Sequence, residues 1–294
     1  MEWVKLSSNK TRKLHFVNKI YNQNCIDGMK QIPKNTIDLI ITDPPFAIDF
    51  KAKRANYNRD AQHVLEGYNE IKQEDYYKFS YKWMGEAYRI LKRSGCMYVF
   101  SGWNNLKDIL NALDVIGFDI VNHIIWKYQF GVVTKNRFVT SHYHCLYVCK
   151  DDSKRKFYRN NRYPDGSLRY RDMEDVWVIN REYWRGEKKT PTKLPSELIR
   201  KILQYSSKEE DMVLDPFLGS GQVAVIAKEM NRNYAGFEIV KEYFNFVQKR
   251  LEETTIQSLI DAEIAKEVEL NTIDERISKV NIEDFPNLAP DSLQ

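Results

Sequence analysis

Four consecutive residues, Asp43-Pro44-Pro45-Phe46, place a carboxylate, two prolines and an aromatic ring directly after the segment 36–42, which contains the largely apolar run 37–41. The run predicts a buried parallel strand. The prolines end that strand, hold the backbone extended and donate no N–H group. Asp43 is therefore an acceptor at the carboxyl end of a strand, where open α/β sheets bind their ligands. With the flat face of Phe46 beside it, the site suits a planar group carrying –NH2, such as a nucleobase.

The segment 215–221, with the sequence DPFLGSG, joins a predicted strand to a predicted helix. Gly219 and Gly221 allow a ligand to approach the main chain, and the first N–H groups of the helix point toward that ligand. Glu238 ends the next predicted strand, where a carboxylate can accept hydrogen bonds from ribose hydroxyls. A glycine turn can also be a tight connection only, and this one lacks a dinucleotide fingerprint and a P-loop lysine. Together with Glu238 it predicts a cofactor that contains a nucleoside.

These candidates need a scaffold in which strands and helices alternate. Apolar runs separated by segments of helical spacing predict an α/β fold with a doubly wound, mostly parallel, Rossmann-like sheet. The composition changes at Asp151 to a polar, basic, turn-rich stretch, which predicts a small inserted region. We expect one domain in two halves, residues 16–150 and 190–260, with the inserted region 151–189 between them and a C-terminal helix and tail over 261–294.

Composition narrows the class of protein. The chain has 294 residues, of which 43% are hydrophobic and 29% charged, as in an ordinary globular protein. No apolar run reaches the ~18 residues of a membrane span. The net charge of +4 permits a polyanionic partner without arguing for one. The four cysteines lie in apolar contexts, so we expect reduced thiols and a cytoplasmic protein. The histidines and cysteines of segment 142–149 have no zinc-site spacing, so we expect no metal.

The two motifs together resemble those of the DNA amino-methyltransferases, which use S-adenosylmethionine. Their order, with the DPPF motif of Asp43 ahead of the glycine turn, resembles the beta group of these enzymes, whose target-recognition segment lies between the two. Protein-glutamine methyltransferases carry a similar NPPY after their glycine turn, so the order argues against them. The resemblance covers residues 16–250 and implies that 151–189 is the target-recognition region.

The resemblance also implies roles for individual residues. In the family the segment before the catalytic strand often contains Gly-Asp, where this chain has Gln23-Asn24, and Leu194 separates Lys193 from the proline that usually follows the basic residue. The catalytic residues implied are Asp43, Pro44, Pro45 and Phe46. The cofactor-binding residues implied are Asn24, Cys25, Asp43, Thr192, Lys193, Asp215, Pro216, Phe217, Gly219, Ser220, Gly221 and Glu238.

The activity implied is site-specific transfer of a methyl group from S-adenosylmethionine to the N6 amine of adenine in double-stranded DNA. The target base would be flipped out of the duplex and methylated by direct in-line transfer. Asp43 favours adenine, because cytosine-N4 enzymes more often have serine there, but N4 methylation of cytosine and methylation of RNA stay open. A non-catalytic nucleic-acid-binding subunit is a further alternative, against which the intact motifs argue. A homodimer and a cognate restriction endonuclease are possible partners.

DNA contacts are expected from two basic stretches that contain aromatic residues. Lysine and arginine would neutralise phosphates, and some would contact base edges in the major groove. Any single one could instead belong to a solvated face. The candidates are Lys51, Lys53, Arg54, Arg59, Lys154, Arg155, Lys156, Arg159, Arg162, Arg169 and Arg171.

Overall fold

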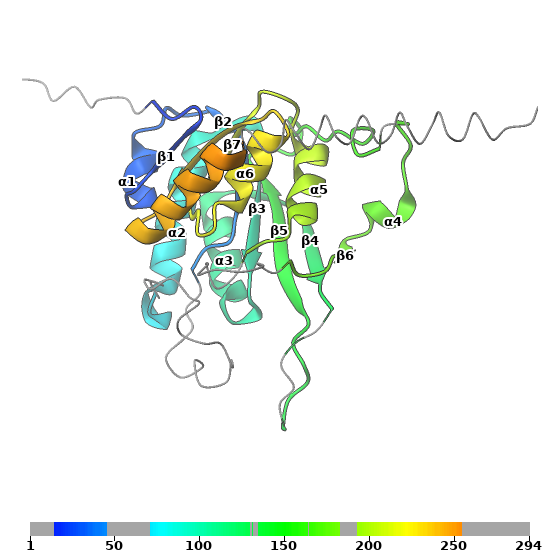
Figure 1. Cartoon of the computed structure of the whole chain (residues 1–294). Coiled ribbons are helices and arrows are strands. Elements are labelled where there is room, and N and C mark those ends of the chain that lie inside the picture. The colour runs from blue at the N-terminus through cyan, green and yellow to red at the C-terminus, as the bar shows by residue number, and fades with distance from the viewer. Residues whose placement is uncertain are drawn as a thin grey trace, which may run out of the picture. The chain divides into compact units, whose positions relative to one another are not determined.

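A computed structural model of the chain describes residues 15–45, 71–129, 131, 135–163, 165–182 and 193–254. Its centre is an eight-stranded sheet with helices on both faces (Figure 1). The sheet lies within the first of two compact units, Met1–Leu251, and the second unit is Glu252–Gln294. The expected inserted region, residues 151–189, falls inside the first unit and does not form a compact unit of its own.

Strands and helices alternate along most of the described chain. The elements are β1 (Lys19–Tyr21), α1 (Cys25–Lys30), β2 (Ile37–Thr42), α2 (Gln73–Ile90), β3 (Leu91–Ser101), α3 (Trp103–Ile116), β4 (Asp119–Lys127), β5 (His142–Cys149), α4 (Tyr170–Met173), β6 (Val176–Val178), α5 (Ser196–Ser206), β7 (Met212–Asp215), α6 (Gln222–Glu229) and β8 (Asn233–Phe237). A further helix spans 241–254.

The strand order is β1-β8-β7-β2-β3-β5-β4-β6. All neighbouring strands of this sheet are parallel except β5, which runs antiparallel to both β3 and β4. From β7 the chain continues through α6 to β8 on one side, and from β2 it continues through α2 to β3 on the other. The strand order therefore reverses between β7 and β2, and open α/β sheets bind ligands at such a switch point. The predicted doubly wound, mostly parallel sheet is confirmed.

Apolar side chains of the strands pack in two layers because successive strand residues point to opposite faces. On one face Leu39 and Ile41 belong to a buried cluster with residues of α5, α6 and the helix over 241–254. On the other face Ile40 packs with residues of α1, α2 and α3, together with Ile37, which precedes an irregularity in the strand register between Ile37 and Leu39. With both faces of β2 covered, only its ends are open to a ligand, which places the site at the carboxyl edge of the sheet.

Two elements depart from the sequence-based expectation for 151–189. The short helix α4 and the strand β6 were not expected, and β6 pairs parallel with β4 at the edge of the main sheet. Only Trp177 of β6 is buried, so a strand of three residues leaves too little pattern to be recognised. Part of the expected inserted region therefore extends the main sheet.

Several further properties concern the described residues only. The four cysteines are buried and unpaired. No group of three or more His, Cys, Asp or Glu side chains in the described ranges could hold a metal ion. Among the helices described, none combines the length and the apolar character needed to cross a membrane.

Candidate active site

The two sequence motifs meet at the switch point between β2 and β7. The Thr42 hydroxyl donates a buried hydrogen bond of 3.0 Å to Asp215 Oδ1, and the two residues are 173 positions apart in sequence. The Phe217 N–H donates to the same oxygen, also at 3.0 Å. Asp215 thus fastens the end of β7 both to β2 and to its own glycine turn. The structure thus brings the ends of the two motif-bearing strands together.

Asp43 follows β2 at this edge, and the next residue, Pro44, is buried. Its Oδ1 atom is buried and has no hydrogen-bond partner among the described residues. Burial raises the pKa of Asp43 to about 7, and the positive charge of Arg181 acts in the opposite direction. Because a buried acceptor without a partner is costly, Asp43 is poised to receive a hydrogen-bond donor from a ligand.

A second carboxyl group beside it is perturbed in the same way. Burial raises the pKa of Asp215 to about 7, the hydrogen bonds from Phe217 and Thr42 lower it, and the nearby charge of Asp43 raises it again. Two carboxylates at one switch point repel each other, so a cation placed between them is stabilised. This electrostatic arrangement suits a positively charged ligand.

The glycine turn holds a conformation that glycine alone adopts without strain. Gly219 has φ 48° and Gly221 has φ 71°, both in the left-handed region. The Gly219 N–H donates to Glu238 Oε2 at 2.9 Å, and the Val240 N–H donates to Glu238 Oε1 at 2.8 Å. Burial raises the pKa of Glu238, which those N–H groups lower. Each carboxylate oxygen keeps a further lone pair, so Glu238 can brace the turn and still accept from ribose hydroxyls.

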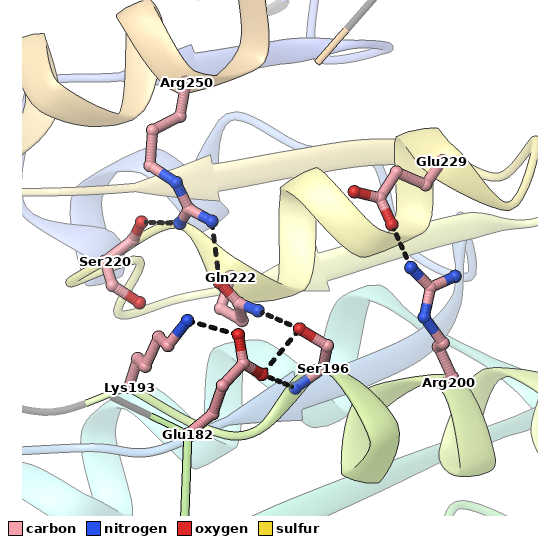
Figure 2. A network of polar contacts seen from close by, with 8 residues as sticks. All are labelled: Glu182, Lys193, Ser196, Arg200, Ser220, Gln222, Glu229 and Arg250. Atoms are coloured by element: carbon pink, nitrogen blue, oxygen red, sulfur yellow. Dashed lines mark hydrogen bonds and ion pairs between the residues drawn. The ribbon is translucent and has the colours of Figure 1, made fainter. Parts of the chain in front are cut away.

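A polar network ties the turn to the segment around Lys193 (Figure 2). Lys193 pairs with Glu182, and Glu182 Oε2 accepts from both the N–H and the hydroxyl of Ser196 at 2.7 Å each. Ser196 Oγ accepts from Gln222 Nε2 at 2.7 Å. Arg250 completes the network by donating to Gln222 Oε1 and to the Ser220 carbonyl. The ammonium of Lys193 is therefore engaged within the protein, and its cofactor role stays a prediction.

Two further candidates, Asn24 and Cys25, lie at the start of α1. Asn24 Oδ1 caps this helix by accepting from the Ile26 N–H at 2.9 Å. The Cys25 side chain is buried, and burial raises its pKa to about 12. The structure thus gives the Asn24 oxygen a capping role that the sequence did not reveal, while its contact with a cofactor stays a prediction. Phe46 and Thr192 lie outside the described residues.

The basic candidates for DNA contact divide into three groups. Lys51, Lys53, Arg54 and Arg59 lie outside the described residues. Lys154, Lys156, Arg159, Arg169 and Arg171 are exposed. The half-buried Arg155 donates to Asp152 at 2.8 Å and to the Tyr147 hydroxyl at 3.0 Å, and Arg162 pairs with Glu197 and Asp172.

The basic candidates in segment 151–156 are also set apart by their position in the fold. Cys149, at the end of β5, lies opposite Cys96 and Asp119, so the segment that follows it starts at the amino edge of the sheet. The Lys156 N–H lies 3.4 Å from the Ser94 carbonyl at that same edge. Residues 151–156 are thus at the end of the sheet opposite to Asp43. For Arg155 this placement and its ion pair favour a structural role.

Other residues at the carboxyl edge escaped the sequence analysis. Tyr128 directly follows β4, Tyr143 is the second residue of β5, and Arg181 lies in the segment after β6. The alternating aromatic residues of this region could have signalled an aromatic cluster, but no pattern distinguished Arg181 from the many other arginines. The stretch 135–140 between β4 and β5 is exposed throughout, and Phe138 is 100% exposed.

A mostly parallel sheet with a glycine turn and two perturbed carboxyl groups at its switch point is typical of a Rossmann-like enzyme that binds a nucleoside-containing cofactor. Residues 37–249 match the family described as DNA methylase, which comprises N6 and N4 methyltransferases. The Type II methyltransferase M.HinfI of Haemophilus influenzae is 31% identical over 251 residues, which is 81% of this chain and 69% of that protein. M2.DpnII of Streptococcus pneumoniae is 30% identical over 232 residues, covering 76% of this chain and 85% of that protein.

Solved structures show the same fold. The cytosine-N4-specific PvuII DNA methyltransferase aligns with a TM-score of 0.61 and 16% identity, covering 82% of this chain and 90% of that one. The M1.HpyAVI complex with S-adenosylmethionine aligns with a TM-score of 0.54 and 24% identity, covering 79% of this chain and 98% of that one. The chain belongs to the DNA methylase family and is an S-adenosylmethionine-dependent DNA methyltransferase. The expected family and cofactor are confirmed.

The bond between Thr42 and Asp215 provides a test of how the site is held together. Replacing Thr42 with valine keeps its shape and removes the donor, so we expect a loss of about 1–3 kcal/mol in the free energy of unfolding at pH 8, where Asp215 is ionised. At pH 5 the carboxyl is protonated, because its pKa is about 7, and the loss should be smaller. Urea denaturation at both pH values measures this, with Thr42→Ser as the control that keeps the hydroxyl. Equal stability of the valine variant and the wild type at pH 8 would contradict it.

Proposed function

We propose that this enzyme methylates the N6 amine of adenine within a short recognition sequence of double-stranded DNA. The observation that carries the proposal is the buried, unpartnered Asp43 Oδ1 at the switch point. The amine of a nucleobase is a poor nucleophile because its lone pair is delocalised into the ring. Acceptors on both amine hydrogens favour a tetrahedral nitrogen and return that lone pair. Asp43 and the carbonyl of Pro44 are the two acceptors in this proposal.

The described residues also fit the cofactor. Bound S-adenosylmethionine supplies a methyl group on a cationic sulfur. The repelling carboxyl groups of Asp43 and Asp215 favour a cation, and the left-handed glycines leave the main chain of the turn open to close approach. Glu238 retains lone pairs for hydroxyl groups. We therefore assign cofactor binding to the turn, Asp215 and Glu238, with Ser220 and Gln222 held in place by the network of Figure 2.

Asp43 serves a second purpose in this proposal. When the amine nitrogen forms its new bond to carbon, it must lose a proton. A pKa of about 7 for Asp43 matches what a general base needs near neutral pH. Most of the rate enhancement is expected from alignment and from fixed charges rather than from a covalent intermediate.

The amine cannot be reached inside a duplex, so the target base must be flipped out. We place the DNA along the carboxyl edge of the sheet, where Asp43 and the exposed stretch 135–140 both lie. Lys135 and Phe138 of this stretch offer a charge for phosphate and an aromatic face for bases. Photocrosslinking from position 138 would label bound duplex if this placement is right, and labelling only from position 154 would overturn it.

Two partners are further proposals. The relatives carry Type II names, which supports a cognate restriction endonuclease in the same system. A homodimer is the second, and sedimentation of the purified protein tests it directly.

The test of the function is to express the enzyme in cells that lack DNA methylation and to map the modified bases. Nucleoside mass spectrometry should show N6-methyladenine, and sequencing of modified bases should place it in one short motif. The same cells expressing Asp43→Ala are the control and should show none. N4-methylcytosine in place of N6-methyladenine would overturn the choice of base, and methylated RNA with unmodified DNA would overturn the choice of substrate.

A further inference from the structure

We propose that Arg181 is a positioning residue for methyl transfer, because its guanidinium, held against two tyrosine rings, supplies the counter-charge for the Asp43 carboxylate that accepts the target amine. The inference rests on the proposed role of Asp43. Arg181 follows β6, the edge strand of the sheet.

The guanidinium of Arg181 rests on an aromatic cluster at the carboxyl edge of the sheet. The rings of Trp126 and Tyr128 lie 5.5 Å apart, and Tyr143 lies 5.8 Å from each of them. The indole N–H of Trp126 donates to the Ile179 carbonyl at 2.8 Å. The cluster is thus fixed both by stacking and by a hydrogen bond to the segment that carries Arg181.

Arg181 is held against this aromatic cluster by its side chain and by its backbone. Its guanidinium carbon lies 3.8 Å from the centre of the Tyr128 ring and 5.6 Å from that of Tyr143, within the range of a cation–π contact. The backbone N–H of Arg181 donates to Gln129 Oε1 at 2.7 Å. The next residue, Glu182, is engaged by Lys193 and Ser196, so its charge is already compensated. The positive charge of Arg181 is therefore fixed in place.

Asp43 lies on the same face of the sheet as this aromatic cluster. Leu39 and Ile41 share one buried cluster with Trp126 and Tyr128, and Asp43 is the next residue in their alternation. Like Asp43 Oδ1, the Nε atom of Arg181 is buried and has no hydrogen-bond partner in the described chain. The site thus presents one acceptor and one charged donor that the protein itself leaves unsatisfied.

The charged and titratable groups around Asp43 make this counter-charge necessary. Asp215 on β7 repels the Asp43 carboxylate, and Cys145 on β5 is also affected by its charge. Arg181 is the one positive group that acts on Asp43 in the part of the chain described. Without it, burial and repulsion would favour the protonated acid, which can accept only weakly from an amine. Arg181 also lines a cavity of about 770 Å³ beside β6 and α5.

The experiment compares the holoenzymes of Arg181→Gln and wild type on duplex DNA, with kcat/KM measured from pH 5.5 to 9.5. We expect the acid limb to move up by at least one pH unit, so that activity at pH 7 falls at least about fivefold, while the plateau at high pH stays within a few-fold of wild type. Arg181→Lys keeps a positive charge, so its acid limb should lie close to that of the wild type. Arg93→Gln removes an exposed arginine that is paired with Asp151. It is the matched control and should leave the pH profile of kcat/KM unchanged.

The possible outcomes separate the proposals. A loss of activity in Arg181→Gln that is equal at every pH would overturn the counter-charge role, since lost packing or a lost substrate contact has no such pH dependence. An unchanged profile would overturn it as well. Circular dichroism and calorimetry with S-adenosylmethionine confirm that the variant folds and binds the cofactor. If instead Asp43→Ala keeps full activity, the proposed function of Asp43 fails first, whatever Arg181 does.

Discussion

Asp43→Ala is expected to lower the rate of methyl transfer by about 10²–10³-fold while S-adenosylmethionine still binds. The substitution removes the acceptor of the target amine and the base for its proton, and loss of a single preorganised group of this kind costs about 10²–10³-fold or more. The glycine turn and Glu238 remain intact, so calorimetric affinity for the cofactor should change only a few-fold. Single-turnover transfer of a labelled methyl group to duplex DNA measures the rate.

The same variant should be more stable than the wild type at pH 8. The pKa of Asp43 is raised to about 7 in the folded protein, against about 3.9 in an unfolded chain. A raised pKa means that the folded state binds the proton more tightly, so stability is greatest below the unfolded pKa and is lost as pH rises through 7. Removing the carboxyl should therefore raise the free energy of unfolding more at pH 8 than at pH 5. Stability sacrificed for a reactive group is a common feature of active sites.

Asp38 offers a matched control on the same strand. It pairs with Lys92 at 2.7 Å and accepts from the Met212 N–H at 3.0 Å, so Asp38→Asn should reduce stability and leave methyl transfer within a few-fold. The two aspartates, five positions apart on and just after β2, are thus expected to respond in opposite ways. An Asp43→Ala variant with full activity would refute the assignment of the catalytic acceptor.

The part of this site that could be predicted from sequence is the part built on periodic elements. The strand before Asp43 and the strand before the glycine turn are mostly apolar, so their carboxyl ends could be placed at one edge. The buried bond between Thr42 and Asp215 could not be foreseen, because it depends on which strands are neighbours in space.

Residues whose role depends on a partner were the hardest to foresee. Arg155 and Arg162 have the composition of DNA contacts, yet in the structure each pairs with carboxylates of its own chain. Asn24 has the chemistry of a base contact, yet its oxygen caps α1. Arg181 carried no signal at all, since only the fold sets it on the tyrosine rings. A side chain's type states what it can bind, whereas its neighbours decide what it does bind.

The second large effect is expected in the glycine turn, where alanine substitutions at Gly219 and Gly221 should lower the free energy of unfolding by different amounts. A Cβ atom on Gly221 would lie 2.4 Å from Val247 Cγ1, whereas one on Gly219 would meet nothing closer than 3.9 Å. Both residues have positive φ, so alanine at either position is strained by about 1–2 kcal/mol. Overpacking against the buried Val247 adds about 1–3 kcal/mol at position 221 alone. Gly221→Ala should therefore lose about 2–5 kcal/mol and Gly219→Ala about 1–2 kcal/mol in urea denaturation.

A second substitution tests the physical cause. Val247→Ala removes both Cγ atoms that the new Cβ would meet, so the double variant should be more stable than the sum of the two single effects predicts. That coupling should be absent between Gly219→Ala and Val247→Ala, because no contact joins them. Cofactor affinity should follow the same order, since the helix over 241–254 that carries Val247 also carries Arg250, which holds the Ser220 carbonyl. Additive effects at 221 and 247 would show that strain in the turn, rather than its packing against this helix, is what requires glycine there.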